Sequence, residues 1–264
     1  EGLGPKRVKQ VYETLKITTL DELTVAAREG KLRDLPGMGA KSEAKILAGI
    51  EALARHGDTR ISLGVAWPIA QAMLDELKRV PGVTAAAVGG SLRRMRDTIG
   101  DIDLLVAADS AEAVMDRFAA LENVESVAGR GPTKTNVVLL NGLGVDLRVL
   151  PAARWGTLLN YFTGSQAHNI RVRAIAQQQG FSLNEYGITP AEGKLIPFAT
   201  EEAVYARLSL AWIPPELRED RGEIEAAALG ANRLPKLITA KDLRGDLQMH
   251  TTWSDGETDV MGMA

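Results

Sequence analysis

Two aspartates at the start of an apolar run are the residues of this sequence best placed to do chemistry. Asp101 and Asp103 open the stretch "DIDLLVAA" (residues 101–108). Residues i and i+2 of a β-strand face the same side, so the two aspartates would lie about 7 Å apart along the backbone. Unpaired carboxylates at that spacing repel each other, whereas Mg²⁺ or Mn²⁺ would be held by their oxygens. The pair therefore predicts a metal site.

A third aspartate is a polar residue within another apolar run. Asp146 lies in "GVDLRVL" (residues 144–150). Three carboxylates that converge from adjacent strands can hold two metal ions roughly 3.5–4 Å apart, an arrangement that catalyses in-line phosphoryl displacement. We therefore predict that Asp101, Asp103 and Asp146 are both the catalytic residues and the ligands of two Mg²⁺ or Mn²⁺ ions.

The stretch before the aspartate pair has the residue types of an anion site. "VGGSLRR" (residues 88–94) reads as a strand end, a glycine turn and a helix start. Glycine lets the backbone approach a ligand closely, and the N–H groups that begin a helix bind anions. Ser91 adds a hydroxyl donor, and Arg93 or Arg94 can form charge-assisted hydrogen bonds to phosphate. A plain turn and a solvated strand end are the alternative interpretations, but together the motifs predict a nucleoside triphosphate carried by metal.

The composition limits the classes of function. The chain has 264 residues, of which 45% are hydrophobic and 25% charged. It contains no cysteine, which excludes disulfides and thiolate metal sites. No apolar run reaches the ~20 residues that a membrane-spanning helix needs. We expect a cytoplasmic protein without a membrane partner.

Charge is distributed unevenly along the chain. The net charge is −3, but residues 185–264 hold 8 Lys and Arg against 14 Asp and Glu, a net of −6. Residues 1–184 therefore hold 23 against 20, a net of +3. Local basic clusters decide phosphate binding more than the total charge does. The overall charge thus leaves a nucleic-acid partner open.

The N-terminal region contains a near-repeat. "GLGPKRVKQVYETL" (residues 2–15) and "LPGMGAKSEAKILAGIEAL" (residues 35–53) each read Gly-x-Gly, a polar step and a helix with apolar residues at three- to four-residue spacing. Between them, "TTLDELTVAAREG" (residues 18–30) begins with a threonine N-cap and ends at a glycine. We predict that this region is all helical.

The pattern changes to strands after about residue 57. A helix over residues 67–80 would carry Pro68 in its first turn. "NGLG" (residues 141–144) predicts a hairpin turn between two apolar runs. We expect a mixed, mostly antiparallel sheet with helices on one face. Its strands are expected at residues 83–88, 101–108, 124–129, 135–140 and 144–150, with a helix at 111–122.

From Pro151 the pattern becomes helical again. Helices are expected at residues 153–162 and 165–180, with a short one at 201–212. A charged stretch with several prolines, residues 212–237, reads as a linker, and "DLRGDLQMHTTWSDGETDV" (residues 242–260) predicts a strand followed by a polar loop. The first residue is not methionine and the last lies within a motif, so we expect a piece of a longer protein.

At "GGSLRR" and "GDIDLL" the chain resembles the nucleotidyltransferase fold, and closely the family X DNA polymerases, the DNA polymerase beta family. "YFTGSQAHNIRVRAIAQQQGFSLNEYGI" (residues 161–188) is similar to the nucleotide-binding and thumb segment of that family. The paired Gly-x-Gly helices look like its helix-hairpin-helix elements. "GDLQMHTTWSDG" (residues 245–256) resembles the opening of the PHP phosphoesterase domain of bacterial members.

The resemblance implies an α+β fold in five parts. These are a helix-hairpin-helix DNA-binding region, a nucleotidyltransferase palm with a mixed or antiparallel sheet, a small α/β nucleotide-binding or thumb subdomain, a linker and a truncated PHP start. We expect them, in that order, at residues 1–57, 58–151, 152–214, 215–240 and 241–264.

The resemblance also assigns residues to the substrates. Tyr161, Phe162 and Gly164 would form the sugar pocket, and Asn169 would touch the base of the incoming nucleotide. Arg173 would contact the template strand, and Arg148 and Glu185 would form an ion pair that changes on closing. A buried aromatic pair and solvated helix charges are the alternative interpretations. The triphosphate would be held by Gly90, Ser91, Arg94 and Gly100, with Arg60 as a helper.

The helix-hairpin-helix elements would bind the DNA backbone. Their glycine turns expose N–H groups to a phosphate, and lysines add charge without reading sequence. A plain turn between helices is the alternative interpretation of each Gly-x-Gly. The residues expected to bind DNA here are Gly2, Gly4, Lys6, Gly37, Gly39 and Lys41.

The function implied is DNA-directed DNA polymerisation. The enzyme would add dNMP to a primer 3′-hydroxyl in gapped DNA during repair, acting as a monomer. Another nucleotidyltransferase, acting on RNA or a small molecule, and a non-catalytic DNA-binding scaffold are the alternatives.

Two features depart from the family pattern. We expect no lyase domain within this chain before the first hairpin, so no lyase residue is assigned. Where the PHP opening usually has His-x-His, this chain has Gln248 and His250. Glutamine replaces imidazole poorly as a metal ligand, and His250 and Asp255 therefore have no assigned site. We expect no exonuclease activity from this chain.

Overall fold

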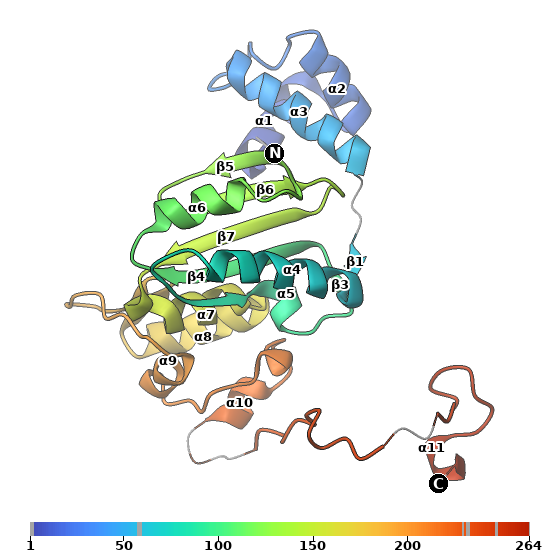
Figure 1. Cartoon of the computed structure of the whole chain (residues 1–264). Helices are drawn as coiled ribbons and strands as arrows, with labels where there is room; N and C mark the ends of the chain where they lie inside the picture. The colour runs from blue at the N-terminus through green and yellow to red at the C-terminus, as the bar shows by residue number, and fades with distance from the viewer. Residues whose placement is uncertain (1–2, 57–59, 229, 231–232, 246–247, 264) are drawn as a thin grey trace. The chain divides into compact units, whose positions relative to one another are not determined.

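The computed structural model describes residues 3–56, 60–228, 230, 233–245 and 248–263 (Figure 1). The chain divides into two compact units, residues 1–232 and 233–264. Unit 1 contains all the strands of the described residues.

Three helices form the N-terminal region, as predicted. They are α1 (Pro5–Leu15), α2 (Leu20–Arg28) and α3 (Ala40–His56). Thr19 caps α2 with a full capping box, because its side chain accepts a bond from the Glu22 N–H while Glu22 accepts from the Thr19 N–H. The near-repeat is visible in the backbone, since α1 follows Gly4 and α3 follows Gly39. The helices close on a small core that includes Val11, Leu23, Leu32 and Ile46.

The region expected to be the palm contains a five-stranded mixed sheet of order β2-β4-β7-β6-β5. Only the central pair, β4 and β7, is parallel, and every other neighbouring pair is antiparallel. A short ladder joins β1 (Ile61–Ser62) to β3 (Thr98–Ile99). The predicted hairpin at residues 141–144 connects β6 to β7. The strands are β2 (Val83–Val88), β4 (Asp101–Ala108), β5 (Val124–Arg130), β6 (Lys134–Leu139) and β7 (Gly144–Leu150).

Helices α4 (Leu63–Lys78) and α6 (Ala111–Ala119) cover one face of this sheet (Figure 1). The alternate β4 residues Ile102, Leu104 and Val106 are fully buried beneath them. Pro68 lies inside α4 rather than in its first turn, so that prediction was wrong. The helix begins earlier because Leu63 and Trp67 pack against the same core as the rest of its buried side.

The opposite face of the sheet is also partly covered, which the sequence did not predict. Helix α7 (Trp155–Thr163) packs Leu158 against Leu105 of β4 and Leu150 of β7. Because side chains alternate along β4, this face is the one that carries Asp101 and Asp103. Helices α7 and α5 (Gly90–Arg93) both contact β4, and the start of β4, with Asp101 and Asp103, lies on this face.

The region expected to be the thumb follows this sheet and includes a segment expected to be a linker. Residues from 215 onward fold against the thumb, because Arg218, Ile224 and Ala227 are almost fully buried. The charged stretch is thus folded up to residue 228. The thumb elements are η1 (Ala152–Arg154), α7, α8 (Gln166–Gln178), β8 (Phe181–Asn184), β9 (Gly187–Pro190), α9 (Glu201–Arg207), η2 (Pro215–Leu217) and α10 (Glu223–Ala227).

Unit 2 contains one short helix, α11 (Val260–Met263), and turns. The strand expected in its first half is not formed by the described residues there, and residues 246–247 lie outside them. His250 and Asp255 are exposed and hydrogen-bonded through Nδ1 and Oδ1 at 2.6 Å. The PHP assignment stays a prediction. None of the described helices has the length and apolar character to cross a membrane.

Candidate active site

The three predicted carboxylates lie on the two parallel strands at the centre of the palm sheet. Asp103 of β4 stands directly opposite Asp146 of β7 in the strand register, and Asp101 pairs with Gly144. Because partners in register share a face, all three aspartates lie on the face that α4 and α6 leave free. Asp101 is exposed, whereas Asp103 and Asp146 are half-buried.

Asp101 and Asp103 have too little positive charge around them to offset their burial and mutual repulsion, so the pKa of each is raised. Burial, together with the charges of Asp101 and Asp146, raises the pKa of Asp103 to about 7. Burial and the charge of Asp146 also raise the pKa of Asp101, and Arg60 and Lys134 oppose this rise. Within the described residues, neither acid forms an ion pair. Hard oxygen donors in this state fit a divalent cation.

Asp146 is held differently, by two β6 residues that the sequence analysis missed. Lys134 Nζ lies 3.0 Å from Asp146 Oδ2, and Asn136 Nδ2 donates a hydrogen bond to Asp146 Oδ1. Among the described residues, no three acidic or imidazole side chains are grouped to hold a metal ion as they stand. The spacing of Lys134 and Asn136 in "KTNVVL" indicates that both lie on one face of a strand. Their partner Asp146 could be identified only once β6 was known to pair with β7.

The glycine turn lies against the carboxylates, as the anion-site prediction requires. Gly89 N–H donates to the Asp103 carbonyl at 2.8 Å. Gly90 has a φ of +55°, and a Cβ there would lie 2.0 Å from Asp103 Oδ2. Only glycine therefore allows this approach. The α5 turn that begins at Gly90 contains Ser91, which is half-buried.

The two arginines of this turn are engaged by the thumb. Arg94 Nε lies 2.8 Å from Glu219 Oε1, and its Nη1 donates to the Thr163 carbonyl at 2.6 Å. Arg93 donates to both carboxylate oxygens of Glu201, at 2.9 and 2.7 Å. Sequence reasoning gave Arg93 no settled role, and its partners Thr163 and Glu201 lie 70 and 108 positions away in the sequence. In this structure Arg94 is a link between palm and thumb.

The remaining predicted phosphate residues lie at the start of β4. Arg60 Nε donates to Thr98 Oγ1 at 2.9 Å. A Cβ on Gly100 would lie 3.1 Å from Arg60 Nη1, so the guanidinium rests against the Gly100 backbone. The structure thus brings Arg60 and Gly100 together beside Asp101. The positive charge of Arg60 acts to lower the pKa of Asp101, against the rise caused by burial.

The end of α7 brings the predicted sugar and base residues together. Asn169 Nδ2 donates to the Tyr161 carbonyl at 2.7 Å, and the rings of Tyr161 and Phe162 meet edge to face at 5.2 Å. Gly164 has a φ of +70°. The Arg148 guanidinium lies 4.8 Å from the Phe162 ring centre. No ion pair between Arg148 and Glu185 is present among the described residues.

The residues predicted to bind DNA occupy two separate places. Gly4, Gly37 and Gly39 lie at the turns that precede or begin the hairpin helices, with Lys6 and Lys41 exposed on α1 and α3. A Cβ on any of these glycines would meet no atom within 4 Å, and all three glycines are exposed. Arg173 is exposed on α8. Gly2 lies outside the described residues.

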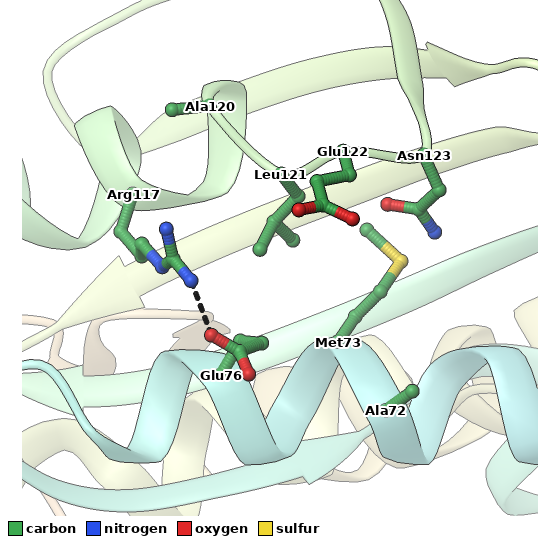
Figure 2. Close-up of a pocket in the computed structure, with 8 residues that line it drawn as sticks. All are labelled: Ala72, Met73, Glu76, Arg117, Ala120, Leu121, Glu122 and Asn123. Atoms are coloured by element: carbon green, nitrogen blue, oxygen red, sulfur yellow. Dashed lines mark hydrogen bonds and ion pairs between the residues drawn. The ribbon is translucent and has the colours of Figure 1, made fainter.

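A cavity of about 420 Å³ lies between α4 and α6, on the face of the sheet opposite the carboxylates (Figure 2). Met73 and Leu121 line it together with Glu76, which accepts a hydrogen bond from Arg117. None of the predicted site residues lines this cavity. We therefore place the site at the β4 and β7 strand ends and not in this hollow.

Comparison with known proteins agrees with this architecture. Residues 158–219 match the family model "DNA polymerase beta thumb", and residues 1–52 match "SAM-like Helix-hairpin-helix tandem". The structure is similar to Leishmania infantum polymerase beta in a ternary P/T complex, with a TM-score of 0.66 and 21% identity over 83% of this chain and 95% of that one. The fold is therefore that of a DNA polymerase beta-type enzyme.

Two curated relatives are similar in sequence. DNA polymerase/3′-5′ exonuclease PolX of Bacillus subtilis (strain 168) is 35% identical over 266 residues, which is 100% of this chain and 46% of that protein. DNA polymerase lambda of Rattus norvegicus is 28% identical over 168 residues, 53% of this chain and 29% of that protein. The chain belongs to the family X DNA polymerases and spans less than half of these two relatives.

Proposed function

We propose that this chain is a DNA-directed DNA polymerase that adds dNMP to the 3′-hydroxyl of a primer, with pyrophosphate leaving, and that it fills gaps during DNA repair. The observation that carries the proposal is the register of β4 and β7. It sets Asp103 opposite Asp146, with Asp101 on the same face and the Gly-Gly-Ser turn alongside. We further propose that the chain acts as a monomer.

The donor set fits a hard divalent cation, on which family X polymerases generally depend. Asp101, Asp103 and Asp146 would hold two Mg²⁺ or Mn²⁺ ions. When bound, such ions neutralise the developing charge of the phosphoryl group and favour ionisation of the attacking hydroxyl. Asp146 is placed to assist removal of the 3′-hydroxyl proton. Gly90, Ser91 and the Gly100 backbone offer N–H and hydroxyl donors to the triphosphate, with Arg60 nearby.

Arg94 would complete the phosphate site only by changing partners. In this structure its guanidinium is held by Glu219 and the Thr163 carbonyl. A triphosphate would have to draw it away, which couples nucleotide binding to the palm–thumb contact. Tyr161, Phe162 and Gly164 would bound the sugar, and Asn169 the base edge.

DNA would be bound through its backbone. The open glycine turns of residues 1–57 would bind phosphate through N–H groups, with Lys6 and Lys41 adding charge, and Arg173 would contact the template. We propose the palm at residues 58–151 and the thumb from 152 to about 228, where the last buried residues of unit 1 lie. Binding that rests on phosphate contacts falls steeply with salt and reads little sequence.

Primer extension on gapped DNA with the variant Asp146→Asn tests the proposal. We expect extension to fall by about a thousandfold or more while DNA affinity stays within about twofold, because the variant removes charge stabilisation of the transition state but no DNA contact. Asp109→Asn, an exposed aspartate directly after β4, is the control and should be unaffected. Retained extension by Asp146→Asn would overturn the role of that residue.

The same assay separates the alternatives. Incorporation on RNA or a small acceptor but not on DNA would identify a different nucleotidyltransferase. DNA binding without incorporation under either metal, in a chain that is folded by circular dichroism, would identify a DNA-binding scaffold.

A further inference from the structure

Asp146 differs from its two neighbours because both of its carboxylate oxygens are occupied. Lys134 Nζ lies 3.0 Å from Oδ2, and Asn136 donates to Oδ1. Asp101 and Asp103 have no comparable cationic partner within the described part of the chain. One residue of the proposed metal triad is thus held by the protein itself.

The position of Lys134 follows from the strand register. Asn136 stands opposite Asp146 across the β6–β7 ladder, and Lys134 stands two residues earlier, opposite Arg148. Residues i and i+2 of β6 share a face, so both project toward the carboxylates. The Lys134 side chain is about one-third exposed, at 35%, and reaches the acid from the open side.

The charge of Lys134 acts on the whole cluster. It opposes the rise in the pKa of Asp101 and is the first of the opposing charges at Asp103. A single ammonium therefore partly neutralises all three acids, which is the task expected of a divalent cation at this place. An ammonium ion on a flexible stem is also easily exchanged, since a partly exposed ion pair contributes only about 0.2–1 kcal/mol.

We propose that Lys134 is a built-in counter-ion of the site, which binds Asp146 in the metal-free protein and is displaced from it by the divalent cation. Asn136 keeps its hydrogen bond and holds the orientation of the carboxylate as the cations exchange. The inference rests on the proposed function only in taking these three aspartates as the cation site. Lys134 is a positioning residue and not a catalytic one.

Mn²⁺ binding to the full chain, without DNA or nucleotide, tests this inference. Free Mn²⁺ is measured by electron paramagnetic resonance at about pH 8.5 for the wild type and three variants. Lys134→Met removes the competing charge at nearly constant length, so its Kd for Mn²⁺ should fall by about two- to fivefold. Lys134→Arg retains the charge and should stay within about twofold. Lys78→Met removes a similar lysine pair, 3.1 Å from Asp75 on α4, and should not change Kd.

Each other outcome overturns the inference. An unchanged or weaker Mn²⁺ affinity in Lys134→Met would show that the ammonium does not compete, and tighter binding in Lys134→Arg as well would show that charge is not the cause. If Lys134→Met does not fold, Lys134→Gln is measured in its place. Primer extension by the wild type is recorded separately: if it fails while the Mn²⁺ shift is seen, the proposed function fails and the counter-ion stands.

Discussion

The negative charges of the three palm aspartates and of Glu201 in the thumb are balanced in opposite ways. On the palm face, three aspartates share one ammonium, and the pKa of Asp103 is raised to about 7. In the thumb, Glu201 is more deeply buried yet receives hydrogen bonds from Arg93, Arg218 and the Trp212 indole. Burial raises the pKa of Glu201, but the two guanidiniums outweigh it and lower that pKa to about 2.

The difference shows which group is structural and which is available. The single negative charge of Glu201 is neutralised by two guanidiniums, so this residue needs no added cation. Its hydrogen bonds connect α9 to Arg93 of the palm turn and to Arg218 in the segment after residue 215. The palm acids have too little positive charge of their own and remain able to bind an added cation. Charge balance thus separates a structural network from a reactive site more clearly than burial does.

The largest expected effect is on the thumb network. Glu201→Gln leaves the buried guanidinium of Arg218 and the partly buried one of Arg93 without their counter-charge, and we expect the free energy of unfolding to fall by about 3–5 kcal/mol. Urea denaturation followed by circular dichroism measures it. Glu202→Gln, an exposed neighbour on the same helix, should change stability by less than about 0.5 kcal/mol. Equal effects of the two variants would refute the claim that Glu201 is the centre of this network.

The second effect is on acid stability. A carboxyl whose pKa is lowered in the folded state stabilises it fully above the ordinary value of 4.5, and loses this contribution as the pH falls through about 2. The lowering of Glu201 corresponds to about 3 kcal/mol. Denaturation midpoints between about pH 5 and 2.5 should therefore fall more steeply in the wild type than in Glu201→Gln. Parallel curves would place the acid sensitivity elsewhere.

The smallest effect has the opposite sign and belongs to the palm. Asp103→Asn removes one of three repelling, partly buried charges, so the metal-free protein should gain about 1–2 kcal/mol of stability near neutral pH. Thermal melting in a chelator measures this gain. Added Mn²⁺ should then stabilise the wild type but not the variant. A variant that melts lower than the wild type in chelator would mean that Asp103 is structural, like Glu201.

Local features of the sequence predicted much of the fold. The bounds of β4, the Thr19 cap, the glycine turn before α5 and the hairpin at residues 141–144 all follow from rules that act within a few residues. The same rules put Asp101 and Asp103 on one face. Pro68 and the segment after residue 215 were misread because burial by distant elements outweighed the local preference for a helix start and for a loop.

Partners of the site residues were the least predictable part. Arg93 and Arg94 looked equally suited to phosphate, yet one binds Glu201 and the other Glu219, both from the end of the thumb. The two-residue spacing of Lys134 and Asn136 placed them on one face of a strand, but nothing within that strand identified Asp146 as their partner. Such contacts are set by strand register and helix docking, which a single sequence does not state.

The sequence by itself determined which side chains carry charge and which of them share a strand face, because both properties depend only on residue type and a two-residue repeat. The tertiary structure decided which charges neutralise each other. It did so by pairing β4 in parallel with β7, by laying β6 against Asp146, and by folding the thumb over Arg93 and Arg94. Electrostatic balance depends on distance in space, and these distances are fixed only when separate elements pack.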